Sequence, residues 1–287
     1  MSKLRERMIQ DMQLRGLSPR TQVSYARAIR LLAQHYHKSP DQITQEELRD
    51  YFLYRKNSSQ WSASAATIAL CAIKFFYENT LRKDFTELKL VRPKRPKKLP
   101  VVLSVQEVRR TLRCARLFHH RVCLTTVYSC GLRLKEAVHL QVPDIDSDRM
   151  FLHIHGKGNK DRYVPLPQRT LQLLRQTWKQ HHNPRWIFPA RAQSGSRQAT
   201  CDTALSLSTI QKGFKDALSR ARVNKTASVH TLRHSYATHL LEQGVDIRII
   251  QQFLGHAYCQ TTMIYTKLTE PAIKPAAEII NHLMADL

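Results

Sequence analysis

Long apolar runs are scarce in this sequence, and their absence limits where the protein can act. The most apolar stretch, ATIALCAI at residues 66–73, is too short to span a bilayer. The first ten residues, MSKLRERMIQ, lack the apolar core of a secretory signal peptide. Six cysteines are scattered singly, without a C-x-x-C pair, so we expect reduced and mostly buried thiols. These features favour a cytoplasmic protein without a membrane segment.

Acidic side chains are few in comparison with basic ones. The chain has 46 Lys and Arg against 22 Asp and Glu, a formal net charge of +24 at pH 7. The excess occurs in both parts, with 20 basic and 9 acidic side chains in residues 1–100 and the remaining 26 and 13 in residues 101–287. Such a charge attracts polyanions, most commonly nucleic acid, although a merely well-solvated surface is the alternative.

The segment VRPKRPKKLP, residues 91–100, divides the chain into two parts. Its three prolines interrupt any helix, and its five Lys or Arg side chains keep it hydrated. We therefore expect an N-terminal domain at residues 1–90, a basic linker at 91–100 and a second domain at 101–287.

The part before the linker has the pattern of a small helical bundle. Ser18 is placed to cap a helix that has Pro19 at its first position. Thr44 and Glu47 form a capping box, which predicts the start of another helix. A further helix is expected over about residues 62–77.

Helical patterns also predominate after the linker, with one exception. Ser104 and Glu107 form a second capping box, and helical spacing continues through residues 124–140. Residues 150–167 alternate apolar and polar side chains on both sides of a Gly-Lys-Gly-Asn turn, which predicts a β-hairpin. The predicted fold class is therefore mainly α, with a small β-sheet in the second domain.

The sequence HTLRH, residues 230–234, places a histidine and an arginine on one helix face. His230 and Arg233 are three positions apart, and a helix that starts near Ser228 would hold both in its first turns. Free N–H groups and the helix dipole favour a phosphate there. A salt bridge or a core histidine is the alternative from these residues alone. Zinc binding by His230 and His234 lacks the glutamate of H-E-x-x-H and a third ligand.

Two other short motifs carry cations. In GLRLKE, residues 131–136, the glycine can end one helix so that Arg133 opens the next, and Glu136 can hold its guanidinium. An arginine fork can donate to two phosphate oxygens. In GKGNKDR, Lys157 lies at the predicted hairpin tip between two glycines, where it can reach a ligand. For Lys160 and Arg162 we expect only a solvated turn.

The order of these motifs, followed by L-G-H at 254–256 and I-Y-T at 264–266, resembles the tyrosine recombinase (integrase) family. The likeness is greatest to Xer-type and related phage and transposon members, and it is strongest over 128–165 and 228–268. It implies a C-shaped DNA clamp made of a helical core-binding domain and an α+β catalytic domain. The site it implies consists of Arg133, Lys157, His230, Arg233, His256 and Tyr265.

The resemblance also implies the role of each residue. Arg133 and Arg233 would hold the scissile phosphate and stabilise its transition state. His256 would donate to a phosphate oxygen.

The remaining three residues would move protons and form the covalent bond. Tyr265 would attack phosphorus to give a 3′-phosphotyrosine, and His230 would accept the tyrosine proton. Lys157 would protonate the leaving 5′-hydroxyl. No metal or other cofactor is implied, since the arginines would supply the positive charge.

Partners follow from the same resemblance. The expected partner is a double-stranded DNA recombination site, bound by a homo-tetramer that acts alone or with a related recombinase, near the nucleoid. A C-terminal tail from about residue 271 would dock on a neighbouring protomer or on its own domain.

Three other functions remain open from the residues. A type IB topoisomerase shares the tyrosine chemistry without joining two duplexes. A DNA-binding protein with a silent site would lack cleavage, and a metal-dependent nuclease would lose activity in EDTA.

Overall fold

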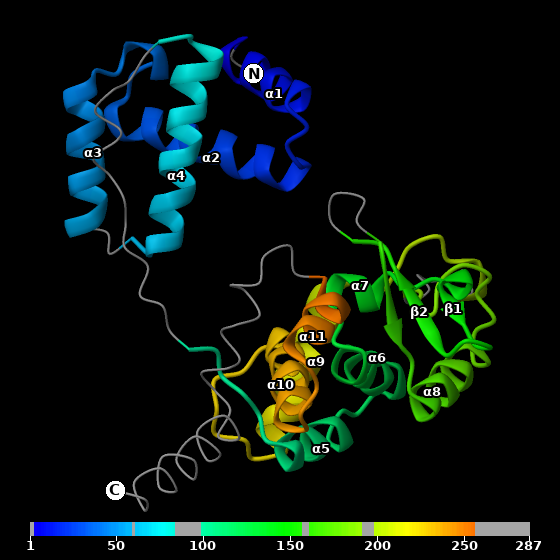
Figure 1. Ribbon diagram of the computed structural model, residues 1–287. Helices are drawn as coiled ribbons and strands as arrows, with labels where there is room; N and C mark the ends of the chain where they lie inside the picture. Colours follow the sequence, from blue (N-terminus) through cyan, green and yellow to red (C-terminus); the bar gives the residue numbers. More distant parts are fainter. Residues whose placement is uncertain (1–2, 59–60, 84–98, 157–160, 191–197, 256–287) are drawn as a thin grey trace, which may run out of the picture. The chain divides into compact units, whose positions relative to one another are not determined.

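The computed structural model describes most of the chain as two compact units, Met1–Lys98 and Leu99–Leu287 (Figure 1). The described residues are 3–58, 61–83, 99–156, 161–190 and 198–255. Most of the expected linker at 91–100 and the whole expected tail from 271 lie outside them. No helix among the described residues is both long and apolar enough to cross a bilayer.

The described part of the first unit is helical, as the sequence predicts. Its elements are α1 (Lys3–Leu14), α2 (Pro19–Tyr36), the 3-10 turn η1 (Pro40–Gln42), α3 (Gln45–Asn57), α4 (Ala63–Phe75) and the π-helical turn η2 (Phe76–Thr80). Buried side chains from α1, α2, α3, α4 and η2 form one core, with Met8, Leu32, Leu48 and Ile73 at most 2% exposed.

The predicted caps set where these helices begin. The Ser18 hydroxyl accepts from the Thr21 N–H at 3.3 Å, and Pro19 is the first residue of α2. Thr44 and Glu47 form the predicted capping box of α3, which satisfies N–H groups that have no partner inside a helix. Both predictions are confirmed.

The second unit is built around one central helix. Its elements are α5 (Val105–Arg113), α6 (Phe118–Ser129), α7 (Leu134–Val138), η4 (Val142–Asp144), β1 (Ile145–Asp146), β2 (Phe151–Ile154), β3 (Arg162–Pro165), α8 (Gln168–Trp178), η5 (Gln198–Thr200), α9 (Leu207–Arg220), α10 (Val229–Glu242) and α11 (Ile247–Leu254). Helix α6 contacts α5, α7, α8, α9 and α10, and Figure 1 shows it between the sheet and the α9–α11 group. Val122, Leu124 and Val127 of α6 are fully buried.

The predicted hairpin forms, with one short strand added to it. Strands β2 and β3 pair antiparallel in a register that sets Ile154 opposite Arg162, and β1 pairs with the other edge of β2. The mainly helical fold with a small sheet in the second unit is therefore confirmed.

The expectation of mostly buried cysteines is wrong for the described part of the chain. None of its five cysteines forms a disulfide, but only Cys123 and Cys130 are buried, while Cys71 is exposed. Cysteine is small, and its fit beside a helix depends on the tertiary neighbours rather than on any local pattern.

Gly131 occupies a position that both its backbone and its neighbours reserve for glycine. Its φ is +60°, and an added Cβ would lie 2.5 Å from the ring of Tyr236 on α10. Gly244 of the same unit also has a positive φ, +82°, but an added Cβ would meet nothing within 4 Å.

We expect Gly131→Ala to destabilise the second unit far more than Gly244→Ala does. Both changes incur left-handed strain of about 1–2 kcal/mol, and the Tyr236 overlap adds about 1–3 kcal/mol for Gly131 alone. Urea unfolding of the full-length variants measures the difference. Equal losses would show that the α6–α10 contact relaxes freely around the new methyl group.

Candidate active site

The turn after α6 places Arg133 at the start of α7. The chain reverses at Gly131, and Arg133 is the N-cap residue, with φ −72° and ψ 147°. Its N–H donates to Oε2 of Glu136 at 2.8 Å, and its Nη1 donates to Oε1 of the same carboxylate at 2.7 Å. The prediction that Arg133 opens a helix and is held by Glu136 is confirmed.

The Glu136 carboxylate pairs with three arginines. Arg162 donates from Nη2 to Oε2 at 2.7 Å and from Nη1 to Oε1 at 3.2 Å. Nη1 of Arg233 lies 3.8 Å from Oε2, and the Glu136 side chain is only 9% exposed. Burial by itself raises the pKa of the Glu136 carboxyl, but Arg162 and then Arg133 hold that pKa below its usual range. The carboxylate is therefore ionised at neutral pH.

The expectation that Arg162 belongs to a solvated turn is wrong. Its side chain is 7% exposed and forms a two-point pair with Glu136. The missed signal is the alternation of β3, since Arg162 and Val164 are both buried while Tyr163 between them is exposed. The Arg162 side chain therefore lies on the buried face of β3.

The same three arginines hold the C-terminal end of α11. Three successive carbonyls accept from them: Phe253 from Arg162 Nε at 2.8 Å, Leu254 from Arg233 Nη2, and Gly255 from Arg133 Nη2 at 3.3 Å. The last carbonyls of a helix lack partners within it and carry partial negative charge, so cations are favourable there.

Packing around this helix end is close. Gly255 ends α11 with φ +60°, and an added Cβ would lie 2.9 Å from Cδ of Arg162. A glycine is therefore needed for two reasons, the left-handed turn and the approach of the arginine.

Helix α10 carries His230 and Arg233 on one face, as predicted. Ser228 is its N-cap residue, and the Ser228 N–H donates to Thr231 Oγ1 at 3.0 Å. Arg233 is 1% exposed, and its Nη1 also donates to the carbonyl of Gly131 at 2.7 Å. Arg233 thus joins α10 to the turn that positions Arg133.

His230 lies near enough to the arginines to be affected by their charges. Although the residue is exposed, neighbouring protein atoms displace part of its hydration, and this, with Arg233 and then Arg133, lowers the pKa of His230 from its ordinary value. His230 is therefore neutral at pH 7 and able to accept a proton. Its ring lies 4.5 Å from that of His234, whose pKa is lowered to about 4 by burial, His230 and Arg233.

Zinc binding by the histidines of α10 gains no support from the described residues. Among the described residues, the side chains grouped closely enough to hold a metal are those of Asp144, His153 and His155. These three are remote in sequence from His230 and His234. The lowered histidine pKa values suit hydrogen bonding and proton transfer as neutral imidazoles.

Of the six predicted site residues, Arg133, His230 and Arg233 are described, and the structure brings them together. Lys157, His256 and Tyr265 lie outside the described residues. Arg133, 39% exposed in its side chain, offers a guanidinium to solvent, and His230 offers a neutral ring. A guanidinium and a neutral imidazole, with further positive charge behind them, suit an anionic ester such as a phosphodiester.

Comparison with known proteins identifies the family of the chain. Residues 102–271 match the model of the phage integrase family, and residues 4–87 match that of the phage integrase N-terminal SAM-like domain. The integrase/recombinase y4qK of Sinorhizobium fredii is 39% identical over 270 residues, 93% of this chain and 85% of that protein. Tyrosine recombinase XerD of Staphylococcus epidermidis is 32% identical over 274 residues, 91% of this chain and 92% of that protein.

Solved structures share the fold. The crystal structure of XerA recombinase covers 96% of each chain at 25% identity, with a TM-score of 0.53. A lambda integrase dimer bound to a COC' core site has a TM-score of 0.73 at 16% identity, over 92% of this chain and 94% of that chain. The chain, with its SAM-like helical domain and its catalytic domain, therefore belongs to the phage integrase family, the tyrosine site-specific recombinases.

Proposed function

We propose that this recombinase cleaves and rejoins DNA through a covalent 3′-phosphotyrosine at Tyr265 and exchanges strands between two duplexes through a Holliday junction. The observation that carries the proposal is the grouping of Arg133, Arg233 and His230 around Glu136, at the end of α11. His256 and Tyr265 belong to the segment of residues 256–287 that directly follows Gly255 in the sequence.

The chemistry is a transfer of one phosphoryl group. The Tyr265 oxygen bonds to phosphorus while the bond from phosphorus to the 5′-oxygen breaks, and Lys157 gives that oxygen its proton. His230, neutral at pH 7, takes the tyrosine proton. The ester bond to Tyr265 replaces the broken phosphodiester, so a 5′-hydroxyl of another strand can reverse the step without an added energy source.

Positive charge would stabilise the transition state. Arg133 donates to the phosphate oxygens from its solvent-accessible guanidinium, with His256 as a further donor. Arg233 adds a second charge from within the site. Glu136 keeps both arginines in place, which avoids reorganising them during the reaction.

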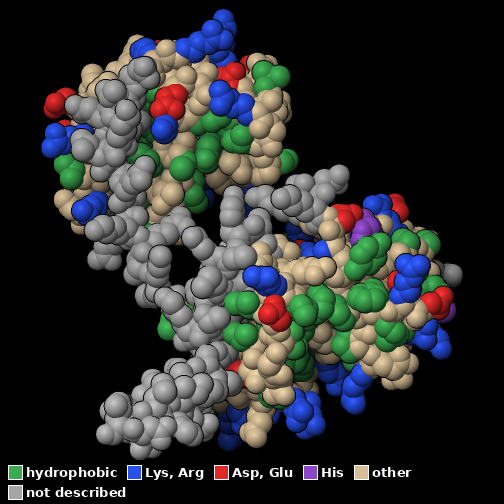
Figure 2. Space-filling view, viewed as in Figure 1, with side chains coloured by type: hydrophobic (Ala, Val, Ile, Leu, Met, Phe, Trp, Pro, Cys, Tyr) green, Lys and Arg blue, Asp and Glu red, His purple; other side chains and the backbone are tan. Residues whose placement is uncertain are grey.

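The DNA partner is proposed on charge and on the DNA complexes of related proteins. The net charge is +24, and Figure 2 shows Lys and Arg side chains at many separate points on the visible surface of each unit. A XerH recombinase with this fold was solved bound to a palindromic difH substrate after cleavage. Phosphate contacts from the domains at 1–90 and 101–287 and from the linker at 91–100 would make binding steeply salt-dependent.

Assembly is proposed on the same basis. A lambda integrase with this fold was solved as a tetramer on a Holliday junction. Four active sites are needed to cut four strands, so we infer a tetramer on DNA, formed by this chain alone or with a related recombinase. The C-terminal tail from about residue 271 would dock on a neighbouring protomer and couple its active site to assembly.

Tyr265→Phe tests the nucleophile. The wild-type protein should form an SDS-resistant adduct with a nicked suicide duplex in the presence of EDTA. The variant should form none, because it lacks the attacking oxygen, yet it should still shift the duplex in a native gel. Gel electrophoresis of radiolabelled DNA measures both.

The outcomes separate the alternatives. A full-strength adduct in Tyr265→Phe would contradict the assignment of the nucleophile. Loss of the wild-type adduct only in EDTA would favour metal-dependent cleavage. Stepwise relaxation of any supercoiled plasmid, without recombinant products, would favour a topoisomerase.

The pH dependence of cleavage tests the role of His230. A base must be unprotonated to work, so the rate falls when pH drops below its pKa, and the lowered pKa of His230 moves that fall below the ordinary value of about 6.5. Rates at DNA concentrations well below saturation should be used, since they report the free protein.

We therefore expect the midpoint of the acid limb to lie below about 6.5. His230→Gln should be slow and should lose this acid limb. A wild-type midpoint above 6.5, or an unchanged acid limb in His230→Gln, would show that another group is the base.

A further inference from the structure

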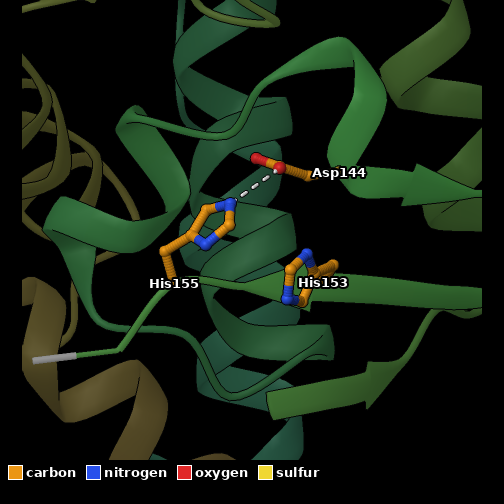
Figure 3. Close-up of side chains that lie close together, drawn as sticks. All are labelled: Asp144, His153 and His155. Atoms are coloured by element: carbon orange, nitrogen blue, oxygen red, sulfur yellow. Dashed lines mark ion pairs between the residues drawn. The ribbon is translucent and has the colours of Figure 1, made fainter. Parts of the chain in front are cut away.

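A second cluster of polar side chains lies at one end of the small sheet, on the hairpin that also carries Arg162. Asp144 ends the 3-10 turn η4, and His153 and His155 come from β2 and the residue after it. Figure 3 shows the three side chains converging, with His155 directed at Asp144. One ligand atom from each lies within 4.8 Å of the other two.

The Asp144 carboxylate is buried and fixed by a hydrogen bond, as a preorganised metal ligand requires. Its side chain is 8% exposed, and its Oδ2 accepts from the Gln141 N–H at 2.8 Å. This bond turns Oδ1 toward His155, whose Nε2 lies 3.3 Å away. A buried carboxylate fixed at one oxygen and aimed with the other is a preorganised donor.

The two histidines share one face of the strand. Residues two apart on a strand point the same way, and the rings of His153 and His155 lie 4.5 Å apart. His153 is also stacked on Tyr163 of β3, with ring centroids 5.1 Å apart and an angle of 21° between the rings. The strand thus brings both imidazoles to one place.

Asp161 supplies the outer partner that metal-binding histidines usually have. Its Oδ2 lies 3.0 Å from His155 Nδ1 and 3.0 Å from His153 Nε2. A carboxylate at Nδ1 keeps the proton on that nitrogen and directs Nε2 of His155 toward the Asp144 oxygen.

We propose that Asp144, His153 and His155 bind a divalent transition-metal ion of the Zn²⁺ kind. Zn–N and Zn–O bonds of about 2.0–2.2 Å in a tetrahedron separate the ligand atoms by about 3.4 Å. The 3.3 Å between Asp144 Oδ1 and His155 Nε2 matches this spacing, and side-chain rotation brings in His153.

The donor set selects the class of ion. Two imidazoles and one carboxylate suit Zn²⁺ and its neighbours, whereas Mg²⁺ and Ca²⁺ prefer oxygen ligands alone. His155, more than half exposed in its side chain, leaves room for water as the fourth ligand. On binding, the ion replaces any proton on His155 Nε2, while the Nδ1 proton stays with Asp161.

Such an ion would tie η4 to β2 and so stabilise the hairpin. It takes no part in the proposed strand cleavage, and the inference does not depend on that chemistry. Metal binding and the phosphotyrosine adduct are therefore separate measurements, and either can fail without the other.

The test is Zn²⁺ binding to the EDTA-stripped and dialysed full-length protein, measured by calorimetry. The double variant His153→Gln/His155→Gln should bind one equivalent fewer than wild type, and Asp144→Asn should bind that equivalent at least tenfold more weakly. His182→Asn is the matched control, because His182 is an exposed histidine of the same unit with a φ of 50° that asparagine tolerates.

A second readout guards against misfolding of the variants. Zn²⁺ should raise the Tm of wild type and His182→Asn, and leave that of the double variant unchanged, while all three retain the same far-ultraviolet circular dichroism without metal. The same Zn²⁺ stoichiometry and Tm shift in the double variant and wild type would overturn the proposal. So would loss of the equivalent in His182→Asn.

Discussion

The Glu136 carboxylate lies between the guanidinium groups of Arg133, Arg162 and Arg233, and each arginine also donates to a carbonyl at the end of α11. Burying one carboxylate is costly unless charged donors surround it. Three cations in one place repel each other unless an anion and the helix end lie between them. The buried carboxylate would be unstable without the arginines, and the three arginines would be unstable without the carboxylate. The carboxylate and the arginines therefore position each other.

This mutual dependence connects segments that are distant in the sequence. Arg133 belongs to the turn after α6, Arg162 to the hairpin and Arg233 to α10, and all three meet the last residues of α11. The segment that follows Gly255 contains His256 and Tyr265. The contacts that assemble the arginines therefore also fix the point from which the proposed nucleophile segment departs, which couples folding of the catalytic domain to its chemistry.

Local patterns predicted the parts of this site that lie close in sequence. Arg133 and Glu136 are three positions apart, and His230 and Arg233 share the first turns of one helix, so spacing alone related them. The pairing of Arg162 with Glu136 spans 26 positions and was missed, because it depends on hairpin register. The hydrogen bonds from the arginines to the α11 carbonyls could not be predicted, since every residue has a backbone carbonyl and no sequence motif identifies which one is used. The Asp144 cluster likewise needs the sheet to bring η4 beside β2.

The most direct test of the central claim is a double-mutant cycle between Glu136 and Arg162. Glu136→Gln, Arg162→Met and the double variant should be unfolded in urea in a Trp61→Phe background, so that Trp178 and Trp186 report on the second unit alone. We expect a coupling free energy above about 1 kcal/mol. In the exposed pair Asp146–Arg149, Oδ2 of Asp146 lies 4.0 Å from Nε of Arg149. The coupling free energy of this pair should be at most about 0.5 kcal/mol. A coupling for Glu136 and Arg162 no larger than that of the exposed pair would contradict the account.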